Sequence, residues 1–124
     1  MTRTNISAVQ IEEVQSAFCR MRAAQYMATP GDAKTGFARS TKGRVPINGL
    51  RHPPKGETSG WYIWCGQELS DVADFFDPLH TFHLYEEYPD LVKLLGLPPG
   101  YRFLLAGDSL DVWYDASLLN VEQD

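Results

Sequence analysis

Large aromatic side chains are concentrated in the second half of the chain, and they constrain its fold more than any other feature. Each such ring buries roughly 150–250 Å² when it is packed, so most of the set has to lie in a core. The set comprises Trp61, Tyr62, Trp64, Phe75, Phe76, Tyr85, Tyr88, Tyr101, Phe103, Trp113 and Tyr114. We therefore predict that residues 60–119 form a packed, aromatic-rich module that is better suited to binding a partner than to catalysis.

Three strands are predicted within this module. Trp61–Trp64 is a compact run of aromatic and β-branched residues that ends at Gly66. Tyr101–Leu105 and Leu110–Tyr114 are two further strands, and Gly107-Asp108 between them accepts the positive φ of a tight turn. The sequence therefore predicts a C-terminal β-hairpin.

Before the module, apolar residues recur every three or four positions from Ile6 to Ala28, which predicts an amphipathic helix capped by Asn5 or Ser7. Its other face, predicted to be solvated, carries Glu12, Glu13, Gln15, Arg20 and Arg22. Gly36–Ile47 is interpreted as two short strands around a bend at Lys42-Gly43.

The rest of the chain predicts one loop and two short helices. Asn48–Ser59 contains too many turn residues for regular structure and is interpreted as an ordered loop. Pro78 favours a helix over residues 79–87, and Pro89 begins a second helix that Gly96 would end in the left-handed conformation. Together these elements predict an α+β fold: an N-terminal helix packed on a small antiparallel sheet, with two short helices and a C-terminal hairpin.

The length of 124 residues favours a single domain over residues 1–124. No apolar run approaches the roughly 20 residues of a membrane span, and Met1–Ser7 precedes no apolar core of a secretory signal, so we expect a cytoplasmic protein. Cys19 and Cys65 are then expected to be reduced.

Residues 1–60 carry nine Lys or Arg against four acids, whereas residues 61–124 carry two against twelve. The acidic half would repel nucleic acid and attract a basic protein.

Few residues suggest chemistry. His80 and His83 are three positions apart on a predicted helix, but a metal site needs three or four convergent ligands, so half-buried, hydrogen-bonded side chains are the simpler interpretation. Arg51 and His52 lie beside Pro53-Pro54 in a loop that could hold an anionic group, although a structural turn is the simpler interpretation here also. No nucleophile elbow, phosphate loop or dinucleotide motif occurs. We expect no enzyme activity, cofactor or metal.

Several blocks, in one order, resemble the immunity protein 33 family of small bacterial proteins. The blocks are Gly49–Pro54, Ser59–Trp64, Phe75–His80, Leu95–Leu104 and Asp111–Asp115. The resemblance covers about residues 49–119, and residues 1–40, with the helix and the basic segment, lie outside it. It implies an α+β domain, encoded beside polymorphic toxins, that neutralises a cognate toxin by binding it.

Charge complementarity with a basic toxin favours the acidic stretch as the contact surface. The predicted partner-binding residues are Asp71, Asp74, Asp77, Tyr85, Glu86, Glu87, Tyr88 and Asp90. The alternative is a small-ligand or metal-binding regulatory or enzymatic domain that uses Arg51, His52, His80 and His83. The oligomeric state is left open.

Overall fold

The computed structural model describes residues 7–120, which form two compact units. The first unit, residues 7–33 and 80–98, contains the helix α1 (Ala8–Met21), the helix α2 (Thr81–Glu87) and the 3₁₀ helix η2 (Pro89–Gly96). The second unit, residues 34–79 and 99–120, contains the β-sheet and the 3₁₀ helices η1 (Arg39–Thr41) and η3 (Ala116–Leu119). None of the described helices is long and apolar enough to cross a membrane.

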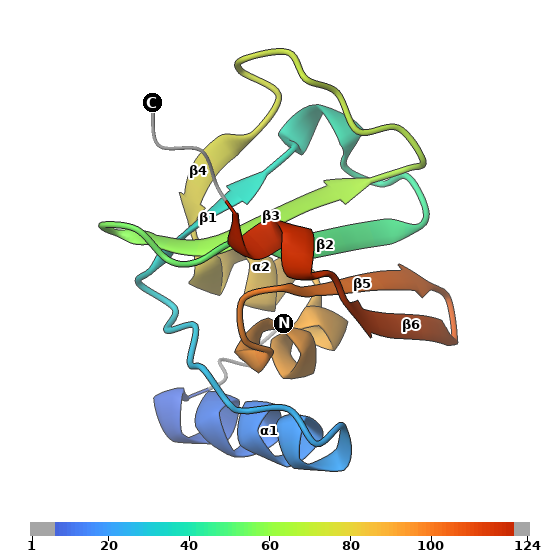
Figure 1. The fold of residues 1–124 in the computed structure, drawn as a ribbon. Coiled ribbons are helices and arrows are strands. Elements are labelled where there is room, and N and C mark those ends of the chain that lie inside the picture. Colours follow the sequence, from blue (N-terminus) through green and yellow to red (C-terminus); the bar gives the residue numbers. More distant parts are fainter. Residues whose placement is uncertain (1–6, 121–124) are drawn as a thin grey trace, which may run out of the picture. The chain divides into compact units, whose positions relative to one another are not determined.

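The sheet has six strands in the order β4-β1-β3-β2-β5-β6 (Figure 1). The strands are β1 (Lys34–Phe37), β2 (Ile47–Arg51), β3 (Thr58–Cys65), β4 (Asp77–His80), β5 (Tyr101–Ala106) and β6 (Ser109–Tyr114). β1 pairs with β3 in parallel, while β3, β2, β5 and β6 pair in antiparallel succession. The predicted α+β class and the C-terminal hairpin are therefore confirmed.

Two packed faces stabilise the sheet. On one face, Trp61 and Phe103 are both buried, with ring centroids 5.7 Å apart. Side chains alternate along a strand, so the neighbours of Trp61 point to the opposite face. That face carries a buried cluster of Ala38, Leu50, Trp64 and Leu118, with Tyr62, Phe75 and Phe76 packed against it. Trp61, Trp64 and Phe103 thus lie in the core of the second unit, as predicted for most of the aromatic set, whereas Trp113 and Tyr114 are exposed.

The predicted loop at residues 48–59 is wrong at both ends, because β2 occupies Ile47–Arg51 and β3 begins at Thr58. Asn48-Gly49 is typical of a turn, but here each residue pairs with both neighbouring strands. The Asn48 side chain donates a 2.7 Å hydrogen bond to the carbonyl of Gly66 instead of closing a turn. Gly49 is required by space, because a Cβ there would overlap the ring of Phe103.

The α1 helix begins as predicted and ends earlier than predicted. Ser7 caps it in a capping box with Gln10. The helix ends at Met21, and Ala23 then adopts a φ of 54°. The predicted faces are partly wrong: Gln15 is fully buried, whereas Met21 is exposed.

Hydrogen bonds explain the burial of Gln15. Its amide nitrogen donates to the hydroxyl of Tyr85 at 2.8 Å and to the carbonyl of Val92 at 3.0 Å. The Tyr85 hydroxyl in turn donates to the carbonyl of Thr29. Because a buried polar group that is fully hydrogen-bonded costs little, this polar side chain replaces an apolar one at the centre of the first unit.

Two predictions around the short helices are also corrected. Pro78 lies in β4, not in the first turn of a helix, and it is tolerated there because β4 is an edge strand. Gly96 is the last residue of η2 and is not left-handed. Its lack of a side chain serves close packing, since a Cβ there would lie 2.6 Å from Cβ of Gln15.

The contact at Gly49 gives a test of the sheet. Gly49→Ala is expected to lower the free energy of unfolding by about 2–3 kcal/mol, because the new methyl group overpacks the site of Phe103. Gly43→Ala is the control: nothing lies within 4 Å of its Cβ position, and its φ of 92° costs only about 1–2 kcal/mol. Urea denaturation measures both. Partial recovery in Gly49→Ala with Phe103→Leu would confirm the steric cause, and equal stability of the two alanine variants would contradict it.

Candidate partner-binding surface

The segment between β3 and β4 is held to the sheet by two phenylalanines at its end. The ring centroid of Phe76 lies 5.2 Å from that of Tyr62 and 6.3 Å from that of Trp64, both on β3. Phe75 packs edge-on against Phe76 at 4.9 Å. These contacts fix the place where the segment returns to the sheet, so the residues before them form a loop with an anchored base.

Residues 67–74, which we call the acidic loop, present carboxylates and aliphatic side chains to solvent. Glu68, Asp71 and Asp74 are exposed, and no Lys or Arg occurs between residues 66 and 76. Leu69 and Val72 are 52% and 60% exposed, so the acidic loop presents two aliphatic side chains to solvent beside its carboxylates. Acidic groups around exposed apolar ones are typical of a protein-interaction surface.

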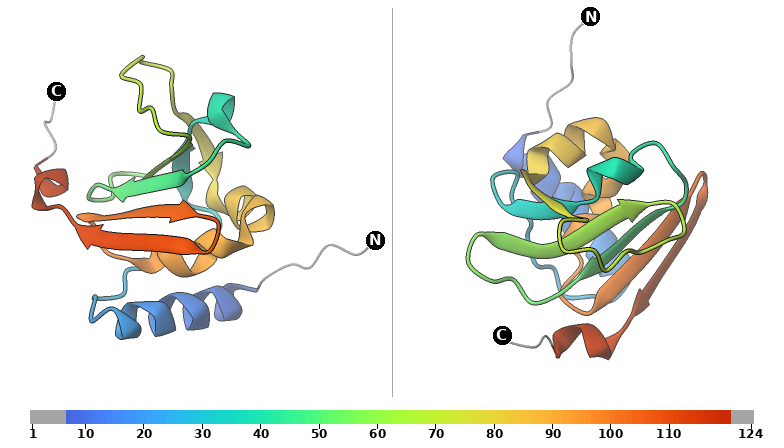
Figure 2. Two further views of the ribbon diagram at one scale, coloured as in Figure 1. Left: turned by 90° about the vertical axis from the view of Figure 1, so that its right-hand side faces the viewer. Right: turned by 90° about the horizontal axis from the view of Figure 1, so that it is seen from above.

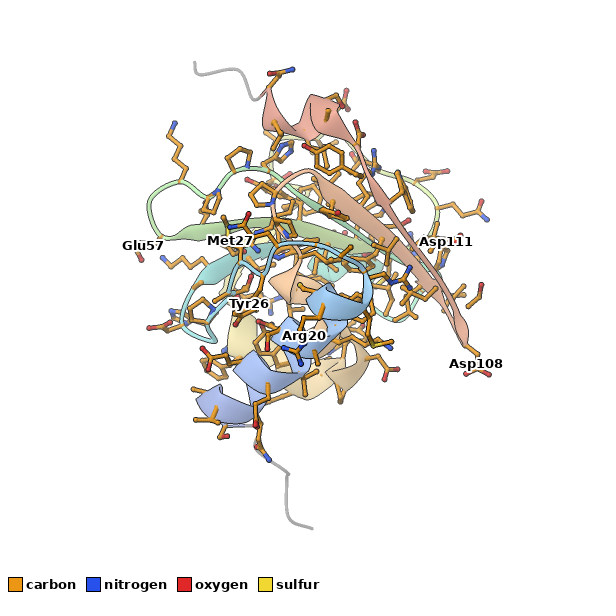
Figure 3. The ribbon with its side chains drawn as sticks, turned by 60° about the horizontal axis from the view of Figure 1, so that its bottom comes forward. Arg20, Tyr26, Met27, Glu57, Asp108 and Asp111 are labelled. Carbon is orange, nitrogen blue, oxygen red and sulfur yellow. The ribbon has the colours of Figure 1, made fainter. Side chains whose placement is uncertain are left out.

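The acidic loop leaves the sheet at the same end as the turn of the β5–β6 hairpin. The register places Cys65 opposite Ile47, Ile47 opposite Leu105, and Leu105 opposite Leu110. Asp108 in the turn and Asp111 on β6 add two exposed carboxylates along this hairpin (Figure 3). On the β1–β3 side of the same end, the Arg44 side chain lies beside Gly66, so basic charge is present there too.

A second polar cluster lies where β6 ends. Asp115 accepts hydrogen bonds from the backbone N–H of Ser117 at 3.0 Å and from its hydroxyl at 2.6 Å, and it pairs with Arg102 at 3.2 Å. The hydrogen bond from the Ser117 side chain, followed by that from Arg102, holds the pKa of Asp115 below its ordinary value. The guanidinium of Arg102 also lies 5.7 Å from the ring centroid of Trp113, which is 42% exposed. The cluster therefore places a cation beside an exposed aromatic ring.

The predicted partner-binding residues are divided between the two units. Asp71, Asp74 and the half-buried Asp77 belong to the second unit. In the first unit Tyr85 is only 2% exposed, because its hydroxyl is hydrogen-bonded inside the core.

The other predicted residues of the first unit lie nearer its surface. Glu86 and Tyr88 are half-buried, and Glu87 and Asp90 are exposed. The structure therefore brings Asp71 and Asp74 together on the acidic loop and leaves Tyr85 in the core.

The predicted ligand residues do not form one group. Arg51 is buried, where its Nε donates to the carbonyl of Ser59 at 2.9 Å and its guanidinium lies over Trp61. His80 precedes α2 in an extended conformation, and both His80 and His83 are exposed, which corrects the half-buried expectation. Their rings lie against Phe82, with centroids 6.0 and 4.2 Å away. Across the described residues, no three His, Cys, Asp or Glu side chains are grouped as metal ligands.

His52 lies in a pocket of about 440 Å³. Its Nδ1 is 2.9 Å from the carbonyl of Leu118, and its ring lies edge-on to Tyr62. The pocket is lined by His52, Pro53, Pro54, Lys55, Thr58, Gly60, Tyr62 and Leu119. In the first unit a second pocket of about 520 Å³ lies beside α1 and includes Glu12, Tyr26 and Asp32.

The sequence interpretation missed Glu68, Leu69 and Val72 as surface residues. The available signal was an acidic and aliphatic segment without Lys or Arg, directly before Phe75-Phe76. Aliphatic side chains are ordinarily assigned to the core, and only the structure shows that the two phenylalanines fill that role.

A family model described as the Imm33-like domain matches residues 14–115. The match begins within α1, so it includes the second part of the helix and the basic segment, which lie outside the resemblance described above. Comparison with curated proteins and with solved structures finds no match. Because the family model spans most of the sequence, the chain belongs to the Imm33-like family.

Proposed function

We propose that this protein is a non-enzymatic immunity protein, which binds a cognate toxin of a bacterial polymorphic toxin system in the cytoplasm and neutralises it by direct contact. Membership of the Imm33-like family supports a protein partner. The single observation that carries the proposal is the acidic loop, in which three exposed carboxylates flank the exposed Leu69 and Val72 along the sequence.

The chemistry of the acidic loop suits a basic partner surface. Carboxylates at an interface rim steer a positively charged protein toward its binding position and raise the association rate. Burying exposed aliphatic side chains then stabilises the complex at roughly 25 cal/mol per Å² of apolar area removed from water, before the costs of association are subtracted. Asp71 and Asp74 supply the first effect, and Leu69 and Val72 supply the second.

The remaining predicted residues extend this proposal. Asp77 follows the anchored base of the acidic loop, and Glu86, Glu87, Tyr88 and Asp90 offer a second acidic region on the first unit. Tyr85 would contribute indirectly, because its buried hydroxyl holds Gln15 and Thr29 in place.

The function is tested with the products of the neighbouring genes. We expect one of them to be toxic when expressed alone, to lose that toxicity on co-expression with this protein, and to co-purify with it. Cell survival and pull-down from the co-expressing strain are the measurements. If every adjacent toxin kills the cells regardless of this protein, the proposal fails.

The role of the acidic loop is tested by charge reversal. Asp71→Lys with Asp74→Lys is expected to slow association with the co-purified toxin by about tenfold or more at low salt, with a smaller effect at high salt, because salt screens exposed charges. Glu12→Lys with Glu13→Lys, at two exposed positions of α1, is a control with the same change of net charge. Surface plasmon resonance at two ionic strengths measures the rates. Equal rates for the double variant and the control would place the contact elsewhere.

The pocket at His52 favours a second candidate function, the binding of a small ligand. Its ligand would meet His52 and Tyr62, whereas Arg51 is engaged beside Trp61. Thermal-shift measurements with anionic metabolites and divalent metals should then show a rise in melting temperature that His52→Ala abolishes and His83→Ala retains. A shift that both variants retain would exclude this pocket as the site.

A further inference from the structure

The two edges of the sheet differ in how they are protected. β4 forms one edge and contains Pro78, which cannot donate a backbone hydrogen bond and so discourages another strand from pairing there. β6 forms the other edge, contains no proline, and is paired with β5 alone within the described chain (Figure 2). The edge at β6 is therefore the one that another strand can join.

The hairpin geometry identifies which backbone groups face outward on β6. A two-residue turn makes Ala106 and Ser109 a hydrogen-bonded pair, and such pairs alternate along an antiparallel ladder. The N–H of Asp115 donates to the carbonyl of Gly100, which agrees with this alternation. Asp111 and Trp113 consequently direct their backbone groups toward β5.

The backbone N–H and C=O groups that point away from β5 belong to Leu110, Val112 and Tyr114. No hydrogen bond within the described chain is assigned to these outward groups, so each of the three residues presents an N–H and a C=O to solvent. Three donor and acceptor pairs in a row are the template on which a strand is added.

The side chains along this edge are suited to recognition. Asp111 and Trp113 share one face, where Trp113 lies beside the guanidinium of Arg102 and remains partly exposed. Tyr114 is 52% exposed on the opposite face and packs edge-on against Tyr101. An added strand would thus meet a carboxylate and an indole on one side and a phenol on the other.

Charge argues against a second copy of this chain as the added strand. In antiparallel pairing of two β6 strands, the outward residues must pair with each other. If the two strands align with residue 111 opposite its own copy, the two Asp111 side chains face each other. If residue 113 lies opposite its own copy, Asp111 faces Asp115. Like charges directly opposite each other destabilise a sheet. The register centred on residue 112 leaves the two Asp111 carboxylates on the diagonal, about 7–8 Å apart. No Lys or Arg follows Arg102, which Asp115 already neutralises.

We propose that β6 accepts an extended segment of the toxin as an additional antiparallel or parallel strand, and that this segment carries Lys or Arg where it faces Asp111. The proposal rests on the proposed function and specifies the manner of binding. The outward backbone groups supply affinity without regard to sequence, while Asp111, Trp113 and Tyr114 select the side chains of the segment.

Amide hydrogen exchange of the full-length protein gives the first test. In the free protein, the amides of Leu110, Val112 and Tyr114 are expected to exchange fast and those of Asp111 and Trp113 slowly. Binding of the co-purified toxin is expected to slow exchange at the three outward amides by about tenfold or more. Slow exchange at all five positions in the free protein would mean that this edge is already covered, by a second copy or by the chain itself, and would overturn the proposal.

Substitutions on β6 give the second test. Val112→Pro removes one outward N–H while the hydrogen bonds to β5 are retained, and we expect it to weaken toxin binding about tenfold or more. Val112→Ala keeps the N–H and is the matched control. Asp111→Lys keeps every backbone group and is expected to weaken binding as well, so the test stands even if the proline variant fails to fold, which circular dichroism would reveal.

The outcomes separate this proposal from the function on which it rests. Toxin binding that is unchanged in Val112→Pro and in Asp111→Lys would overturn strand addition and leave the immunity function intact. Failure of every neighbouring product to bind the unmodified protein would remove both. Weakened binding in both variants, with Val112→Ala like the unmodified protein, would support the added strand.

Discussion

The ring of Phe103 fills the space that a side chain on Gly49 would need, and the arrangement of the sheet depends on this contact. β2 lies between β3 and β5, so its register is fixed from both sides. A slip of one residue would bring a side chain of Asn48 or Leu50 to the position of Gly49 and exchange the two faces of the strand. The positions of the acidic loop and of the β6 edge both follow from this register.

Features that depend on neighbouring residues could be predicted from the sequence. The hairpin was recognisable because Gly107-Asp108 and the flanking strands are contiguous, and the cap at Ser7 because a capping box spans only four positions. The sequence does not predict the strand at Ile47–Arg51, for the opposite reason. Its local signal, Asn48-Gly49, is typical of a turn, and only pairing with two distant strands makes it extended.

The candidate partner-binding surface also has features that the sequence predicts and features that depend on long-range packing. Composition located the acidic residues Asp71 and Asp74, but the exposure of Leu69 and Val72 depends on the packing of Phe75 and Phe76 on β3. Long-range hydrogen bonds also decide which polar groups are buried.

Two polar residues show this dependence. Gln15 belongs to the core because acceptors at Tyr85 and Val92 meet its amide, and these lie at least 70 positions away in the sequence. Periodicity contains no information about such partners, so it predicts a solvated Gln15. The acidic residues near Tyr85 predict, for the same reason wrongly, that this tyrosine is accessible to a partner.

The two-residue turn between β5 and β6 determines which residues of β6 direct their backbone groups toward β5 and which direct them outward. A single substitution on β6 leaves the alignment of β6 with β5 in place. A shift of β6 by one residue against β5 would instead exchange the inward and outward backbone groups and reverse the faces of Asp111, Trp113 and Tyr114 together. Divergence of this edge among homologues can therefore be gradual only while the alignment is kept, and a shift of one residue would replace the whole set of outward groups in a single step.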